Sequence, residues 1–179
     1  MMHVLATVSI YGFAGLLVWA AVSDFGTFII PNRICVALVV LYPAYVLAAS
    51  VSSAQPVPWI GALFTAAGVF LAGLFLFAAR AMGGGDVKLM SGTALWAGTG
   101  LIVPFLIVTV LAGAVLAGVV AVRICVNAVR EGADGVVTPG ALAMGIANIR
   151  HVPLAKVQIP YGVAVATGGL YVAFRLLTG

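Results

Sequence analysis

Long uncharged segments dominate the chain. Residues 4–23, 34–79, 89–122 and 157–174 contain no Lys, Arg, Asp or Glu. A helix that crosses a membrane needs about 20 apolar residues, because each residue rises about 1.5 Å and the hydrocarbon core is about 30 Å thick. Residues 34–79 have room for two spans, and residues 89–122 are longer than one span requires. The pattern predicts an all-α polytopic membrane protein with about six transmembrane helices.

Turn-forming residues divide the two longer segments. A run rich in Ser and Pro occupies residues 50–58, and Gly98-Thr99-Gly100 interrupts the other segment. Pro104 then suits the first turn of the next helix. The expected spans are residues 4–23, 33–50, 58–80, 86–98, 102–123 and 158–176. We expect them to form one membrane-embedded domain over residues 1–179.

Charged side chains are scarce and scattered. Only 8 Lys and Arg and 4 Asp and Glu occur in 179 residues, which is 7% of the chain. A soluble domain has about 25% charged residues, so the composition excludes a soluble globule. Single, dispersed basic residues cannot neutralise a row of phosphates, which excludes nucleic acid as a main partner.

The positions of the basic residues predict the orientation, because short cytoplasmic loops collect Lys and Arg. With the N-terminus outside, only Arg175 lies on the outer side. A long cytoplasmic loop, residues 127–158, then joins helices five and six. The seven basic residues on the cytoplasmic side are Arg33, Arg80, Lys88, Arg123, Arg130, Arg150 and Lys156.

Two aspartates adjoin the expected spans on the cytoplasmic side. Asp24 closes the first span, and Asp86 follows a run of glycines directly before span four. Asp86 precedes the turn at Gly98 by about 18 Å of helix, so we expect it below the membrane surface. An acid at that depth is costly and marks a functional site. The alternative is that both aspartates are helix caps.

Paired carboxyl groups can catalyse hydrolysis. Two Asp side chains within hydrogen-bonding reach cannot both ionise, so one acts as a base on water and the other donates a proton. That pair would hydrolyse a peptide bond without a metal ion or a covalent nucleophile. Cys35 and Cys125 lie near the expected cytoplasmic ends of spans, so neither a disulfide nor a zinc site is indicated. No cofactor is expected.

Three segments follow one another along the chain: Asp24 with Ile30-Pro31-Asn32, then Gly83-Gly84-Gly85-Asp86-Val87-Lys88-Leu89 with its GxGD pattern, then Pro160-Tyr161-Gly162. In this order they resemble the type IV prepilin peptidase family, in particular the short members of tight-adherence (Flp-type) pilus systems. The resemblance implies an aspartic endopeptidase of the cytoplasmic (inner) membrane. Such an enzyme removes the leader peptide of prepilins at the cytosolic face.

The resemblance also implies roles for single residues. Asp24 and Asp86 match the catalytic pair. We interpret Lys88 as a membrane anchor, and Tyr161 as an interfacial aromatic residue or a hydrogen-bond donor to the pair. The motif and supporting residues are Gly83, Gly85, Lys88, Pro160, Tyr161 and Gly162.

The implied partners are a prepilin helix within the membrane, the lipid bilayer and the pilus assembly machinery. Longer family members carry an additional domain with paired Cys-x-x-Cys motifs and also methylate the new N-terminus. This chain has two cysteines in all, so we expect neither a separate N-terminal methylase domain nor methylation. We further expect residues 139–149 to help dock the prepilin.

Two other functions fit the same residues. In a small proton- or ion-coupled transporter, Asp24 and Asp86 would be protonation sites on an ion path. Only one glycine-rich break lies beside an acid, whereas an inverted repeat would give two. In a structural assembly subunit, both aspartates would only cap helices, and Asn would replace them with little loss.

Overall fold

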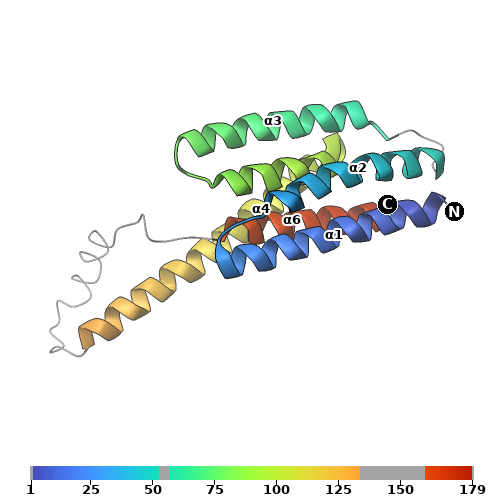
Figure 1. Cartoon of the computed structure of the whole chain (residues 1–179). Coiled ribbons are helices and arrows are strands. Elements are labelled where there is room, and N and C mark those ends of the chain that lie inside the picture. Colours follow the sequence, from blue (N-terminus) through green and yellow to red (C-terminus); the bar gives the residue numbers. More distant parts are fainter. Residues whose placement is uncertain (1, 53–56, 134–159, 179) are drawn as a thin grey trace. The chain divides into compact units, whose positions relative to one another are not determined.

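The computed structural model describes residues 2–52, 57–133 and 160–178 (Figure 1). Within them the chain is helical without strands, and every helix is long and apolar enough to cross a membrane. This confirms the prediction of an all-α polytopic membrane protein. The proposed docking segment, residues 139–149, lies outside the described residues. The helices are α1 (Met2–Thr27), α2 (Asn32–Ser52), α3 (Trp59–Ala78), α4 (Gly84–Ala133) and α6 (Tyr161–Thr178).

Gly98 divides α4 into two legs. Its backbone angles, φ 55° and ψ −166°, belong to a region that essentially only glycine adopts. The first leg, residues 84–97, rises about 21 Å at 1.5 Å per residue, which is less than the roughly 30 Å hydrocarbon core. The break lies in the turn expected from Gly98-Thr99-Gly100, and α4 continues beyond the expected end at residue 123 to Ala133.

Alanine at position 98 is expected to destabilise the protein by about 1–3 kcal/mol, because alanine does not readily adopt this conformation. A Cβ at Gly98 would meet only Ala62, at an ordinary 3.7 Å, so crowding does not add to the cost. Denaturation of Gly98→Ala in detergent measures the loss. Gly100→Ala is the matched control, because a Cβ there meets nothing within 4 Å. Equal stability of Gly98→Ala and Gly100→Ala would contradict the glycine-specific backbone conformation at position 98.

By its internal contacts the chain forms two compact units. The first comprises Met1–Gly113 and Pro160–Gly179, and the second is Ala114–Ile159. Of the second unit, the structure describes the last part of α4. All the candidate site residues belong to the first unit.

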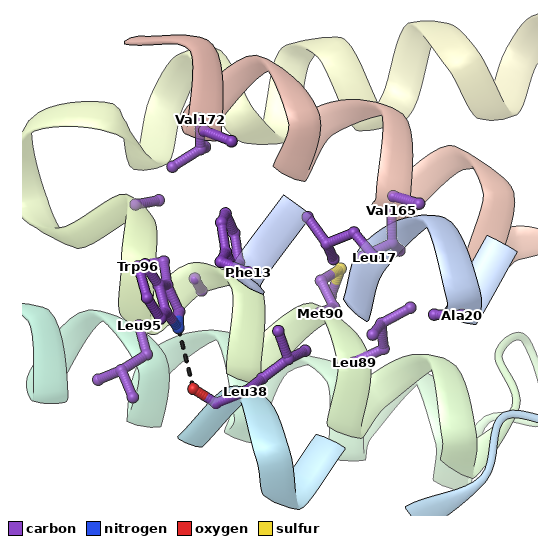
Figure 2. Packing of buried hydrophobic residues seen from close by; sticks show 14 of the residues in the cluster. Phe13, Leu17, Ala20, Leu38, Leu89, Met90, Leu95, Trp96, Val165 and Val172 are labelled. Carbon is purple, nitrogen blue, oxygen red and sulfur yellow. Dashed lines mark hydrogen bonds between the residues drawn. The ribbon is translucent and has the colours of Figure 1, made fainter. Parts of the chain in front are cut away.

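Aromatic residues link three helices in the core of the first unit (Figure 2). Phe13 of α1 stacks on Trp96 of α4 with ring centroids 4.4 Å apart and planes within 10°. The Trp96 indole N–H donates to the Leu38 carbonyl of α2 at 3.0 Å. Phe13 and Leu38 are fully buried. These contacts fix α1, α2 and the first leg of α4 relative to one another.

Large apolar side chains cover the outer surface of the first unit. Phe25 and Phe75 are each 74% exposed and Phe64 is 76% exposed. Apolar surface of this extent is unfavourable in water and suits contact with lipid tails. The outward residues therefore agree with a membrane environment.

Helix α6 packs antiparallel to α1. Gly162, near the start of α6, contacts Asp24 near the end of α1, whereas Gly169 contacts Leu17. The chain also places the starts of α2 and of α4 at the end of the unit that holds Asp24 (Figure 1). Residues far apart in sequence are thereby brought to one end of the first unit.

Candidate active site

Asp24 is a buried acid held by another helix. It lies in the last turn of α1, which continues past the expected end at residue 23 to Thr27, and it is only 4% exposed. The backbone N–H of Gly162 donates to Asp24 Oδ2 at 2.7 Å, and the N–H of Val163 also donates to this carboxyl group. The Asp24 side chain thus accepts hydrogen bonds from the N-terminal turn of α6.

The contact between α1 and α6 requires glycine at position 162. A Cβ there would lie 2.8 Å from Asp24 Oδ2 and 2.9 Å from Asp24 Cγ. Pro160, which precedes the helix, is buried and its carbonyl accepts the Val163 N–H at 3.2 Å. The segment Pro160-Tyr161-Gly162 therefore starts α6 directly against the carboxyl group of Asp24.

Asp86 lies in the first turn of α4 and is half-buried. Its carboxyl group accepts a hydrogen bond from the Gly83 N–H, while the Val87 N–H donates to the Gly83 carbonyl at 3.2 Å. An acid at the third helical position that reaches back in this way is a capping-box arrangement. A Cβ on Gly83 would lie 2.9 Å from Asp86 Oδ2, so glycine leaves the carboxyl group room to turn back.

The segment that contains Ile30 and Asn32 contacts the glycine motif. A Cβ on Gly85 would lie 3.3 Å from Ile30 Cβ, which is tighter than an ordinary contact. The Lys88 ammonium group donates to Asn32 Oδ1 at 3.0 Å. These two contacts attach the start of α2 to the start of α4. Ile30 and Asn32 were part of the motif in sequence, but no local pattern indicated which residues they contact.

Replacement of Lys88 is expected to have a small effect, because its ammonium group is exposed and bonds to the Asn32 amide. We expect Lys88→Met to lower the free energy of unfolding by less than about 1 kcal/mol and to leave the rate of any reaction at the two acids within about threefold. Asn32→Ala, which removes the other side of the same bond, is the matched control. A rate loss of about 100-fold in Lys88→Met alone would contradict the anchor interpretation and give Lys88 a role in the reaction.

The two carboxyl groups are brought within electrostatic range of each other. Asp24 comes from the end of α1 and Asp86 from the start of α4, so one acid is enclosed and the other partly accessible. Among the described residues, no three His, Cys, Asp or Glu side chains gather into a group that could hold a metal ion. Chemically, two carboxyl groups that influence each other's charge can serve as a proton acceptor and a proton donor.

Tyr161 is half-buried at the start of α6. Its hydroxyl group makes no hydrogen bond with any described residue, and the donors that reach Asp24 from this segment belong to the backbone. A contribution of Tyr161 to the pair stays a prediction.

The fold and the site together define a multi-pass membrane protein with paired acids at one end of its helices. Comparison with known families adds that the model of the type IV leader peptidase family matches residues 11–120, more than half of the chain. The chain belongs to the type IV leader peptidase family and is a protease. Both Asp24 and Asp86 lie within the matched region. Comparisons with curated proteins and with solved structures found no match.

Proposed function

We propose that this protein is a prepilin peptidase of the cytoplasmic (inner) membrane that removes the leader peptide from type IV, Flp-like prepilins. Membership of the leader peptidase family supports this activity. The observation that carries the proposal is that the Asp24 and Asp86 carboxyl groups, which come from separate helices, lie within electrostatic range of each other. The pair accounts for hydrolysis by activated water.

In the proposed reaction, one carboxylate takes a proton from a water molecule, whose oxygen attacks the carbonyl carbon of the scissile bond. The other, protonated carboxyl group donates to the carbonyl oxygen. Collapse of the tetrahedral intermediate then breaks the C–N bond. The leaving amine takes the proton that the first carboxyl group removed from water, and the other carboxylate takes a proton back from a hydroxyl group of the intermediate. Neither step needs a covalent enzyme intermediate.

The charge distribution supports a site on the cytosolic side. Arg33 and Lys88 are exposed at the end of the first unit that holds the two aspartates, and Arg175 lies in the last turn of α6, near the other end. Basic residues accumulate on the cytoplasmic side of membrane proteins. The leader junction would thus be cut at the cytosolic membrane face.

The short first leg of α4 supports access from the membrane. If the turn at Gly98 lies at the outer surface, the helix of about 18 Å between Asp86 and Gly98 leaves Asp86 below the inner surface. The apolar helix of a prepilin could then remain in the bilayer while its leader junction reaches the pair. The prepilin helix, the bilayer and the pilus assembly machinery are accordingly the proposed partners.

A structural role is the second candidate, because both acids accept hydrogen bonds at helix N-termini. Asp24 bonds to the start of α6 and Asp86 to the turn before α4. Carboxylates and Asn side chains cap helices about equally well. If the acids only cap helices, Asn replacements should leave the function of the protein intact. If the acids catalyse the reaction, Asn replacements should abolish it.

Co-expression with a candidate Flp-type prepilin, in cells without another leader peptidase, tests the proposal. The expected result is a pilin shortened by its leader, as determined by mass spectrometry of the membrane fraction. Full-length prepilin in the presence of correctly inserted protein would contradict the proposal for that substrate class. A proton or ion flux in vesicles without any cleavage would instead support the transporter.

A further inference from the structure

The two acids have different hydrogen-bond surroundings. Asp24 is 4% exposed and accepts N–H groups of Gly162 and Val163, which belong to a different helix. Asp86 is half-buried, and its donor, Gly83, precedes it in the same turn. The pair is therefore asymmetric in both its donors and its access to solvent.

The donors around Asp24 favour a negative charge on it. The first N–H groups of a helix have no carbonyl partner within that helix, and the helix dipole places partial positive charge there. A buried carboxylate is stable only where such donors satisfy it. The C-terminal end of α1 carries partial negative charge and disfavours a carboxylate there. The hydrogen bonds from α6 therefore stabilise the negative charge on Asp24. Asp86 lies within electrostatic range of Asp24. The Lys88 ammonium group, two residues after Asp86, bonds to Asn32.

We propose that Gly162 is a positioning residue whose backbone N–H holds Asp24 as the ionised, water-activating carboxylate, so that Asp86 carries the shared proton. This rests on the proposed function. In the attack step, Asp24 takes a proton from water, the water oxygen bonds to the carbonyl carbon, and Asp86 protonates the carbonyl oxygen. In the collapse step the C–N bond breaks, the amine takes the proton from Asp24, and Asp86 regains its proton from the intermediate.

The chain offers a matched control on the same helix face. A Cβ on Gly162 would lie within 2.9 Å of three Asp24 atoms. Gly169 follows seven residues later on α6, where a Cβ would lie 2.5 Å from Leu17 and 2.8 Å from Thr93. Alanine at either position crowds the contact with α1, but only alanine at position 162 displaces the carboxyl group.

The protonation states can be measured without any substrate. The chain contains three aspartates, Asp24, Asp86 and Asp134, so protein labelled with ¹³C at the Asp carboxyl carbon gives three NMR signals, assigned with single Asn variants. At neutral pH we expect the ionised shift for Asp24 and the protonated shift for Asp86. Gly162→Ala should move the Asp24 signal, and Gly169→Ala should not. A protonated Asp24 in the wild-type protein, or no movement in Gly162→Ala, would overturn the proposal.

Kinetics provide the second readout. Gly162→Ala should lower kcat for leader removal about 100-fold, the scale of a misplacement near 1 Å, with KM within about threefold. Gly169→Ala should retain the kcat of the folded fraction within about threefold. An equal loss of kcat in both variants would reduce Gly162 to a packing role.

If Gly162→Ala folds poorly, the stability of a double variant still tests the contact between Gly162 and Asp24. Asp24→Gly removes all three crowded atoms, so the double variant Asp24→Gly/Gly162→Ala should lose no stability relative to Asp24→Gly. The same loss from Gly162→Ala in both backgrounds would contradict the contact. The NMR and stability measurements need no prepilin. If the wild-type protein cuts no prepilin, the proposed function is contradicted, but these two measurements still test the role of Gly162.

Discussion

Asp24→Asn is expected to reduce leader removal by about 1,000-fold or more, because an amide cannot take a proton from water and general acid–base groups contribute on that scale. The fold should persist, since the Asn Oδ1 atom can still accept the Gly162 N–H that bonds to Asp24 Oδ2 at 2.7 Å. The measurement is the initial rate of prepilin shortening in membranes that contain equal amounts of inserted protein.

Ser23→Ala is the matched control for Asp24→Asn. The Ser23 hydroxyl group donates to the Ile29 carbonyl at 2.9 Å, so its removal perturbs the adjacent turn while it leaves the acids in place. This control should keep its rate within about threefold. If Asp24→Asn kept more than a tenth of the wild-type rate of prepilin shortening, Asp24 would not be a catalytic residue.

Asp86→Asn is expected to cause a loss of the same size for a different reason. The neutral amide cannot supply the proton that the carbonyl oxygen needs, although its oxygen can still accept the N–H of Gly83 and hold the first turn of α4. The rate of prepilin shortening, compared with the melting temperature in detergent, separates chemistry from folding. We expect little change in melting temperature.

Ser91→Ala serves as the control on α4. The Ser91 hydroxyl group donates to the Val87 carbonyl at 2.7 Å, one turn beyond Asp86, and its loss should leave the rate within about threefold. If Asp86→Asn and Asp24→Asn both process prepilin normally and stay folded, the two acids are helix caps alone. A loss of activity that follows the loss of folded protein would likewise favour the structural role.

The membrane fold was accessible from sequence because its determinants are local. A run of apolar residues predicts a span by itself, and the turn at Gly98 depends on a backbone conformation that glycine adopts readily. The extension of α4 to Ala133 was not predicted, because the basic and polar residues after position 122 continue the helix beyond the apolar segment. Hydropathy detects the membrane boundary, whereas helix formation does not stop there.

The sequence singled out the candidate site residues but did not indicate their contacts. Scarcity of charge made Asp24 and Asp86 conspicuous. The bond between Asp24 and Gly162 joins residues 138 positions apart, and no periodicity encodes such a pair. Asp86 lies in the first turn of α4, although the sequence also allowed it to be the N-cap. The glycines before it carry no side chains that would indicate where the helix begins.

Purified protein in lipid vesicles with a synthetic Flp-type prepilin gives the most direct test of whether the two acids catalyse leader removal. The wild-type protein should cut one peptide bond at the leader junction, with both products identified by mass spectrometry, and Asp24→Asn and Asp86→Asn should each give no product under the same conditions. Cleavage at the wild-type rate by either Asn variant, or no cleavage by the folded wild-type protein, would contradict catalysis of leader removal by the two acids.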